Sequence, residues 1–258
     1  MAEQDKTECR ESGVVVITGA SRGIGAATAR LAAVRGFAVA VNYTTGEKEA
    51  ADVVRDIVAR GGKASAIQAD LAKESDIVRL FVEAERQIGP IRGLVNNAGV
   101  TGGFARVEDV TANLLERLFA INVSGAILCA REAVKRMSTQ HGGSGGSIVN
   151  ISSLAARTGS PGEWVHYAAS KGAIDTFTIG LAREVAKEGI RVNAVAPGLV
   201  ETGIHAANGE PGRLERLKRT IPMGRPGKPE EIAESVVWLL SSAASYVTGA
   251  VLEVGGGR

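Results

Sequence analysis

The sequence predicts an α/β fold, a doubly wound parallel sheet of about seven strands flanked by helices. Two observations predict it. Short apolar runs rich in Val, Ile and Ala alternate along the chain with longer amphipathic stretches. The first apolar run leads directly into a glycine-rich turn at residues 18–25, which opens a helical stretch. Parallel strands need crossover connections of this kind, so the repeating order indicates a parallel sheet.

The individual elements follow from the same alternation. The apolar runs predict strands because small and β-branched side chains suit strands that are buried on both faces. The expected strands are residues 14–18, 37–43, 64–69, 91–96, 147–152, 191–196 and 251–254. The amphipathic stretches between them predict helices at residues 23–35, 46–60, 73–88, 111–138, 164–188 and 229–242.

Length and composition fit one folded domain. The chain has 258 residues, of which 45% are hydrophobic and 33 are glycine, and this excludes disordered and fibrous classes. We expect residues 1–12 to form a flexible N-terminal arm and residues 13–258 a single domain. Residues 198–228 are rich in Gly, Pro and charge and follow the carboxyl end of a strand, which suits a mobile lid. An ordinary surface loop is an equally good interpretation of that composition.

Charge, apolar patterning and cysteine content narrow the function classes. The net charge of +2 is spread along the chain without a basic stripe, so we expect no nucleic-acid partner. No eighteen apolar residues run together, so we expect no membrane span. Cys9 and Cys129 are far apart in the sequence, the first in a polar N-terminal arm and the second in an apolar helical pattern. A disulfide framework is therefore not expected, which favours a reducing, cytoplasmic location.

The three histidines show no metal-ligand spacing with one another or with acids and cysteines. We therefore expect no catalytic metal. His166 and His205 could line a substrate pocket, but a structural, hydrogen-bonded histidine is the favoured interpretation for each.

The glycine-rich turn has the spacing G-x-x-x-G-x-G, with its glycines at Gly19, Gly23 and Gly25. Free backbone N–H groups at a helix N-terminus bind phosphate, and missing side chains let a pyrophosphate approach closely. A plain tight turn is the alternative, because an isolated glycine cluster is weak support for a nucleotide site.

Tyr167 and Lys171 stand four residues apart in an expected helix, and Ser153 precedes the tyrosine at the end of an expected strand. Residues at this spacing share a helix face, so an ammonium would lie beside a phenol. Two unit charges ~4 Å apart interact by about 4 kcal/mol at an effective dielectric of ~20, enough to lower a tyrosine pKa substantially. A solvent-facing amphipathic pair is the alternative.

These motifs, taken in order, resemble those of the short-chain dehydrogenase/reductase family, and most of all its 3-oxoacyl-carrier-protein reductases and glucose 1-dehydrogenases. The resemblance runs from about Gly13 to the C-terminus. It rests on TGASRGIG at 18–25, NNAG at 96–99, Asn122, ISS at 151–153, YAASK at 167–171 and PG at 197–198.

The resemblance implies a Rossmann-like fold, a homotetramer and a catalytic group of Asn122, Ser153, Tyr167 and Lys171. In the reducing direction Tyr167 would donate a proton to the carbonyl oxygen and Ser153 would hold that oxygen. Asn122 could instead satisfy backbone groups inside a kinked helix. Neighbouring Ser152 should face the other side of its strand, where it would cap or bond the backbone.

The resemblance also implies a nicotinamide cofactor. The second strand ends in Asn-Tyr-Thr-Thr at 42–45, without the acid that NAD-preferring enzymes place there, and Arg22 supplies a cation for a 2′-phosphate. We therefore expect NADP(H), although Arg22 could be a solvated turn residue and Asp70 a helix cap. The implied contacts are Gly19, Ser21, Arg22, Gly23, Ile24, Gly25, Asn42, Tyr43, Thr44, Asp70, Leu71, Asn97, Ala98, Gly99, Tyr167, Lys171, Pro197, Gly198, Val200 and Thr202.

The expected function is therefore an NADPH-dependent oxidoreductase acting on a small-molecule carbonyl or secondary alcohol, 3-oxoacyl or sugar-like. A non-catalytic NADP(H)-binding sensor or scaffold protein is the alternative. Trp164 and Met223 could form apolar pocket walls. The basic residues Arg213, Arg216, Lys218 and Arg219 could attract an anionic substrate or an acidic carrier protein, although a solvated helix face is the favoured interpretation.

Overall fold

A parallel sheet of seven strands, in the order β3-β2-β1-β4-β5-β6-β7, forms the centre of the computed structural model. The structure describes residues 13–203 and 212–258. The expected N-terminal arm at 1–12 and His205 lie outside these ranges. The strands are β1 Val14–Ile17, β2 Ala38–Tyr43, β3 Ala64–Gln68, β4 Ile91–Asn96, β5 Gly146–Ile151, β6 Ile190–Pro197 and β7 Val251–Val254.

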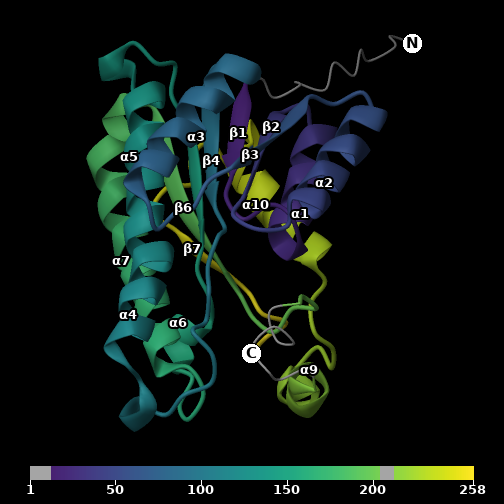
Figure 1. The fold of residues 1–258 in the computed structure, drawn as a ribbon, viewed down its shortest axis with the longest axis vertical. Coiled ribbons are helices and arrows are strands. Elements are labelled where there is room, and N and C mark those ends of the chain that lie inside the picture. The colour runs from purple at the N-terminus through teal and green to yellow at the C-terminus, as the bar shows by residue number, and fades with distance from the viewer. Residues whose placement is uncertain (1–12, 204–211) are drawn as a thin grey trace.

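Helices cover both faces of this sheet (Figure 1). The α-helices are α1 Gly23–Val34, α2 Glu47–Ala59, α3 Glu74–Gln87, α4 Ala112–Phe119, α5 Ala126–Met137, α6 Ala155–Thr158, α7 Val165–Val185, α9 Arg213–Leu217 and α10 Pro229–Leu240. Short 3₁₀ turns lie at Val107–Asp109, Thr139–His141, Ala186–Glu188, Lys218–Thr220 and Ser242–Ala244. The expected sequence of strands and helices is thus confirmed, with boundaries shifted by a few residues.

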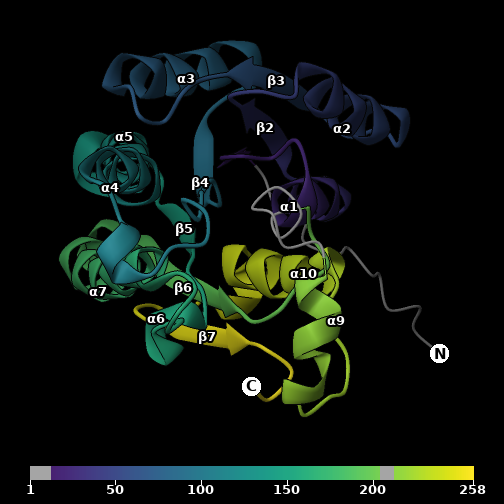
Figure 2. The ribbon, with the colours of Figure 1, turned by 60° about the horizontal axis from the view of Figure 1, so that its bottom comes forward.

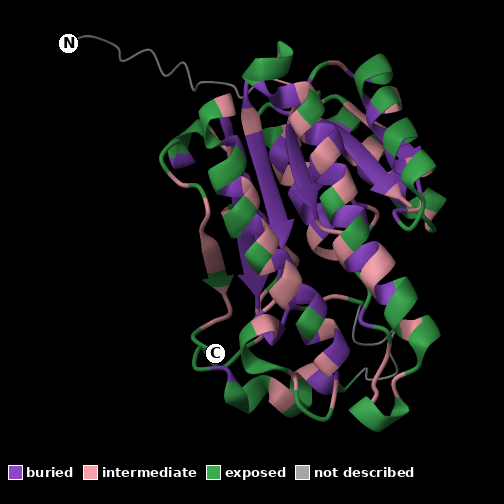
Figure 3. Ribbon diagram, turned by 90° about the vertical axis from the view of Figure 1, so that its left-hand side faces the viewer, coloured by how far each residue is buried: buried purple, intermediate pink, exposed green. Residues whose placement is uncertain are grey.

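Two apolar clusters hold the layers together. One packs α1, α2 and α10 on one face of the sheet, with Val39, Ile57 and Val236 among its buried residues. The other packs α3, α5 and α7 on the opposite face and includes Phe81 and Met137. The strands β1, β2, β4, β5 and β6 are largely buried (Figure 3), which is why their sequences are continuous apolar runs. The edge strands β3 and β7 are mostly half-buried or exposed.

The strand order reverses at β1. From β1 the chain builds β2 and β3 toward one edge, and it then returns to place β4 on the other side of β1. The carboxyl ends of β1 and β4 therefore diverge into different loops, which opens a crevice at this point. All registered neighbours pair in parallel, so the loops that follow the strands gather at one end of the sheet (Figure 2).

The long expected helix at 111–138 contains a π-helical segment. Residues Ala120–Gly125 form one π turn between α4 and α5. The combined helix Ala112–Met137 is long and apolar enough by composition to cross a membrane, and 28% of its most apolar window is buried. Cys129 and Ala133 on its inner side belong to the core, so this helix packs on the sheet.

The expected lid at 198–228 is described except for residues 204–211. Its two ends pair through a parallel bridge between Val200 and Gly227. Between them, α9 lies near the C-terminus of the chain (Figure 2). The described parts of the segment therefore lie at the end of the sheet where the strand-following loops meet.

Candidate functional site

A cavity of about 810 Å³ lies at the carboxyl ends of the strands, between the glycine turn and α9. This volume is in the upper part of the range typical of small-molecule sites. Its walls come from the loops after β1, β2, β3, β4, β5 and β6 and from the helices α4, α7 and α9. The sheet thus brings together segments that are far apart in the sequence.

The glycine turn forms one end of the cavity and fits a pyrophosphate. α1 begins at Gly23 with neither a side-chain cap nor an acidic residue in its first turn, so its first N–H groups are available to an anion. A Cβ at Gly25 would lie 2.5 Å from both the Asn97 amide nitrogen and the Gly19 oxygen. Only glycine therefore permits this close packing of the turn on the β4 loop.

Arg22, Tyr43, Thr44 and Thr45 line the cavity beside the glycine turn. None of the four is acidic, and Arg22 is exposed, so its guanidinium can reach a phosphate. This is the end of the cavity where a 2′-phosphate fits the residues present.

Asn42 does not line the cavity, contrary to its place among the expected cofactor contacts. It is buried, its amide oxygen accepts from the Gly19 N–H at 3.1 Å, and its amide group donates to the carbonyls of Ile67 and Ala69. Asn42 therefore fixes the glycine turn to the neighbouring strands. Gly25 likewise acts through packing and lies outside the lining of the cavity.

The loops after β3 and β4 supply the next part of the wall. Asp70, Leu71, Asn97, Ala98 and Gly99 all line the cavity. Asp70 does not cap a helix, because α3 is preceded by Lys73; its carboxylate accepts from the backbone N–H of Ala72. The Asn97 amide donates to the carbonyl oxygens of Thr18 and Gly19, which ties the β4 loop to the glycine turn.

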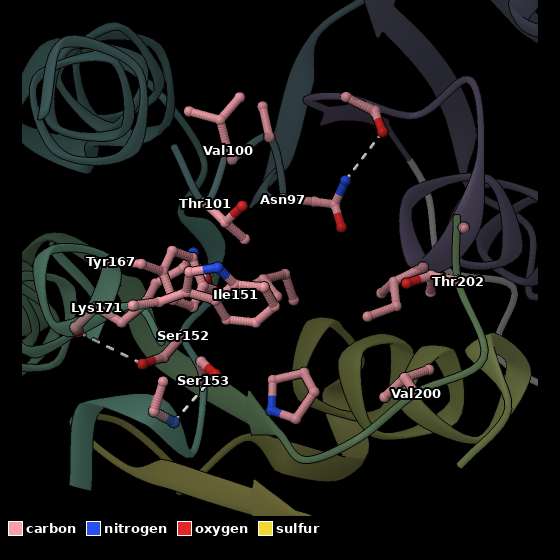
Figure 4. A pocket seen from close by; sticks show the side chains of 18 of the residues that line it. Asn97, Val100, Thr101, Ile151, Ser152, Ser153, Tyr167, Lys171, Val200 and Thr202 are labelled. Atoms are coloured by element: carbon pink, nitrogen blue, oxygen red, sulfur yellow. Dashed lines mark hydrogen bonds between the residues drawn. The ribbon is translucent and has the colours of Figure 1, made fainter. Parts of the chain in front are cut away.

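The loop after β6 faces this wall from the other side. Pro197, Gly198, Val200 and Thr202 line the cavity, and Figure 4 shows Val200 and Thr202 across it from Ser153 and Tyr167. A Cβ at Gly23 would lie 3.4 Å from the Thr202 methyl carbon. The loop therefore comes close to the start of α1.

Ser153, Tyr167 and Lys171 meet in the middle of the cavity (Figure 4). The Tyr167 hydroxyl lies within hydrogen-bonding reach of the Ser153 side chain. The Lys171 ammonium lies 5.7 Å from the centre of the Tyr167 ring and donates to the Ile151 carbonyl at 2.6 Å. The expected grouping of a serine, a phenol and an ammonium is thus present in the structure.

The electrostatics of this group differ from expectation. Burial raises the pKa of Tyr167 to about 12, against the opposing effects of the Ser153 hydrogen bond and the charge of Arg213. Burial also lowers the pKa of Lys171 to about 8, opposed by the charge of Asp175. The loss of solvation therefore outweighs the lowering of the tyrosine pKa that was expected from the lysine.

Ser152 and Ser153 both follow the end of β5 and both line the cavity, whereas only one of them was expected to meet a substrate. Their hydroxyl groups have different partners. Ser152 is 2% exposed, and its hydroxyl lies between the Lys171 carbonyl, at 3.5 Å, and the Asp175 carboxylate. The Ser153 oxygen accepts from the Ala155 N–H at 3.1 Å. Its own proton therefore remains available toward the cavity.

Asn122 lies just outside the cavity lining. Its side chain forms two hydrogen bonds of 2.8 Å with the N–H and the carbonyl of Val100, and a third with Ser170. It thus satisfies backbone groups from the π turn, as one interpretation of the sequence expected. A Cβ at Gly99 would contact both Asn122 and Lys171. Asn122 therefore holds the part of the β4 loop that lies beside the lysine.

Aromatic residues and Arg213 close the other end of the cavity. Trp164 is 4% exposed and lies 4.7 Å from Phe104 and 6.1 Å from Tyr167 between ring centres. The Arg213 guanidinium lies 4.3 Å above the Trp164 ring and pairs with Glu163 at 2.5 Å. Arg213 is only 5% exposed, so the favoured interpretation of a solvated helix face was wrong for this residue.

Other expected site residues lie elsewhere. Arg216, Lys218 and Arg219 are exposed, and Met223 is 65% exposed and does not line the cavity. His166 is buried, and one ring nitrogen bonds the Thr101 carbonyl at 3.0 Å, which is a structural role. The described residues contain no group of three or more His, Cys, Asp or Glu side chains that could hold a metal ion.

Several lining residues were not expected from the sequence, among them Arg117, Glu163, Leu217 and Arg258. Arg117 belongs to α4, and the expected helix gave no sign that this face meets the cavity. Arg258 is brought here by the packing of the C-terminal segment on residues 221–223, which follow α9. No sequence motif could have identified it.

Comparisons with known proteins were made over the whole chain. Residues 19–258 match the model of the family described as enoyl-(acyl carrier protein) reductase. An oxidoreductase of Escherichia coli K12, named YgfF, is 52% identical over 95% of this chain and 99% of its own length. A 3-oxoacyl-[acyl-carrier-protein] reductase of Synechocystis is 38% identical over 95% of this chain and 96% of its own.

A solved structure also superposes closely. The angucycline C-6 ketoreductase LanV, with bound NADP, matches with a TM-score of 0.87 and 34% identity. The match covers 96% of this chain and 98% of that protein. The likeness therefore extends to sequence and fold over nearly the full length.

Proposed function

The chain belongs to the short-chain dehydrogenase/reductase family of oxidoreductases, and from this premise we propose that it is an NADPH-dependent reductase of a small-molecule carbonyl group, or the reverse alcohol dehydrogenase. The observation that carries the proposal is the meeting of Ser153, Tyr167 and Lys171 at one wall of the cavity. Two hydroxyl groups there can hold one carbonyl oxygen, and a lysine is close behind them.

NADP(H) is the proposed cofactor. The glycine turn offers free N–H groups to a pyrophosphate, and Arg22 stands where a 2′-phosphate would lie, without an acid among the neighbouring lining residues. LanV, which carries NADP, adds support by likeness. When bound, the nicotinamide supplies the hydride for the reaction.

Tyr167 acts as the proton donor in reduction. With a pKa of about 12, its phenol is protonated at neutral pH and can donate to the carbonyl oxygen. The Ser153 hydroxyl, whose oxygen is held by the Ala155 N–H, donates to the same oxygen and stabilises its developing charge. The two residues thus act on one atom of the substrate.

Lys171 stabilises the phenolate that Tyr167 becomes after donation. Its pKa of about 8 keeps most of it charged at neutral pH, while its burial removes the solvent that would screen this charge. Asn122 positions the backbone at Val100, beside the lysine. We propose for it a positioning role, with the water relay toward Lys171 implied by the family resemblance.

Oxidation of NADPH, followed at 340 nm with a panel of ketones and aldehydes, tests the proposal. We expect turnover by the wild type and a loss of about 10²–10⁴-fold in kcat/KM for Tyr167→Phe, the range that general acid catalysis contributes. Thermal protection by NADPH should be retained by the variant. Protection of the wild type without oxidation of any substrate would instead favour the sensor or scaffold alternative.

Arg22→Ala tests the choice of cofactor. Loss of a charge-assisted contact to the 2′-phosphate should raise KM for NADPH about 10-fold or more and leave KM for NADH nearly unchanged. Arg55→Ala, at an exposed arginine of α2, is the matched control and should change neither value. An equal change for both cofactors in Arg22→Ala would contradict the assignment.

We also propose an oligomeric state and a cellular location for the enzyme. The apolar residues Leu115, Ile127 and Ile179 of α4, α5 and α7 are more than a third exposed, which supports a homotetramer assembled through these helices. The buried Cys129 thiol is free, in keeping with a cytoplasmic protein. We propose a 3-oxoacyl or sugar-like substrate, as the family resemblance implies.

A further inference from the structure

We propose that the substrate carries a carboxylate close to its carbonyl group, and that Arg213 binds this carboxylate. The inference rests on the proposed reductase function and names the class of substrate, a short oxo acid. It starts from the position of the Arg213 guanidinium at the end of the cavity, one aromatic ring away from the catalytic phenol.

Arg213 is built into the site. Its guanidinium carbon lies 4.3 Å from the centre of the Trp164 ring, and the Trp164 ring meets the Tyr167 ring edge to face. The charge of Arg213 is close enough to Tyr167 to lower the phenol pKa against the effect of burial. A ligand whose carbonyl reaches Tyr167 therefore needs only a few further atoms to reach Arg213.

Positive charge exceeds negative charge at this end of the cavity. Within the described residues, Glu163 is the single carboxylate that lines it. Glu163 pairs with Arg213 at 2.5 Å and with Arg216 at 3.5 Å, and its charge also acts on Arg258. Among the described residues that line this end of the cavity, the guanidinium groups of Arg213 and Arg258 thus share one side-chain carboxylate. A second carboxylate, from a ligand, would balance this excess.

Arg213 also has an unused donor. Its Nε is buried and has no hydrogen-bond partner among the described residues. Glu163 engages the Nη2 atom, which leaves the guanidinium short of the paired acceptors that its planar fork can hold. A carboxylate of the substrate is an acceptor of the right shape for such a fork.

The burial of Arg213 separates this proposal from docking of an acidic carrier protein. A protein surface would meet the exposed cations Arg216, Lys218 and Arg219. Arg213 is enclosed between Trp164, Glu163 and the cavity. Only a small group that enters the cavity together with the carbonyl can contact it.

Matched pairs of acids and methyl esters test the inference. The probes are pyruvate, acetoacetate and 4-oxopentanoate, in which the carboxylate lies progressively further from the carbonyl, each with its methyl ester. We expect the wild type to reduce at least one acid about tenfold or more better than its ester, judged by kcat/KM. Arg213→Met should remove this preference, a change of about 10- to 100-fold in the ratio.

Three further variants guard against a merely structural effect. Arg219→Met removes an exposed cation outside the cavity lining and should leave the acid-to-ester ratio unchanged. Glu163→Gln removes the competing carboxylate and should raise the ratio, whereas a purely structural pair would weaken reduction of acid and ester alike. Arg213→Lys keeps the charge without the fork and should retain part of the preference, which covers the case that Arg213→Met fails to fold.

A binding measurement separates this inference from the proposed function. The chain has two tryptophans, so Trp238→Phe leaves Trp164 as the single reporter beside Arg213. Saturable quenching by 4-oxopentanoate but not by its ester would support the carboxylate site, even if no carbonyl compound is reduced.

Two results would overturn the inference. One is equal or better use of the esters at all three spacings, which leaves the reductase function intact. The other is the absence of saturable binding of any of the three acids to wild type and to Trp238→Phe.

Discussion

At the scale of single residues, burial sets the chemistry of the proposed catalytic group. Tyr167 and Lys171 both lose contact with solvent, which favours the neutral form of each side chain. The pKa of Tyr167 rises to about 12 and that of Lys171 falls to about 8. The tyrosine is thereby prepared to donate a proton, and the lysine carries a charge that little water screens. Removal of either group should affect stability as well as catalysis.

Lys171 makes the stability of the protein depend on pH in a defined window. Its pKa in the folded state, about 8, lies below that of a free lysine, 10.5, so the folded protein binds fewer protons than the unfolded chain between these values. Stability therefore rises with pH through this window, relative to a variant without the group. The unfavourable contribution is fully present below pH 8.

Lys171→Met should reveal this contribution. Between pH 7.5 and 9.5 the unfolding free energy of the wild type should rise by about 2 kcal/mol relative to that of the variant, measured by urea denaturation at both pH values. Arg55→Met, at an exposed residue of α2, serves as the control and should run parallel to the wild type. Parallel profiles for Lys171→Met would mean that the lysine is not buried as a cation.

The sequence identified most residues of this group but not their electrostatics. Strand alternation was a poor guide to Ser152 and Ser153, because β5 ends at Ile151 and both serines line the cavity. The burial of Arg213 depends on the packing of α9 against Trp164, residues that are far apart in the chain. No local pattern distinguishes such an arginine from the exposed Arg216 three positions later.

At the scale of elements, the glycine turn and α1 were the most predictable part of the site. A strand, a turn with fixed glycine spacing and a helix N-terminus are contiguous in sequence, so one short segment specifies the geometry. Gly19 and Gly23 have positive φ angles of 61° and 56°, which glycine adopts without strain. The sequence indicated the π turn at Ala120–Gly125 only as a possible kink. The side chain of Asn122 in this turn bonds Val100 of another loop, a contact that the local sequence does not predict.

Gly25→Ala should damage the turn through its contact with the β4 loop. The new methyl group would overlap Asn97 and Gly19, so we expect a loss of about 1–3 kcal/mol in unfolding free energy and of most nucleotide protection. Gly180→Ala, in the interior of α7 with no atoms within 4 Å, is the matched control. It should be neutral or stabilising by about 0.5–1 kcal/mol in thermal or urea unfolding.

At the scale of the whole molecule, alternating apolar and amphipathic segments predicted a parallel sheet flanked by helices, but the order of the strands was established only by the structure. Seven strands in parallel can be arranged in many ways, and the reversal at β1 depends on crossover packing that no single segment encodes. The same holds for the approach of the C-terminal Arg258 to the cavity. Long-range contacts of this kind explain why the substrate end was harder to predict than the cofactor end.

The proposed homotetramer makes a prediction at this scale. Ile179 of α7 is 38% exposed, and Ile179→Asp would place a charge in the proposed interface between chains. We expect light scattering to report four chains for the wild type and fewer for the variant. Val58→Asp, on the exposed face of α2, should leave the mass unchanged. A wild type that is monomeric at micromolar concentration would contradict the assembly.

The bridge between Val200 and Gly227 has a consequence for how such an enzyme can diversify. Because paired backbone at its base anchors the intervening stretch, changes within that stretch need not propagate into the sheet or the glycine turn. Grafting this stretch from a relative should transfer that relative's substrate preference while the host retains its own affinity for the nucleotide. Evolution would then alter which compounds are reduced without rebuilding the redox apparatus.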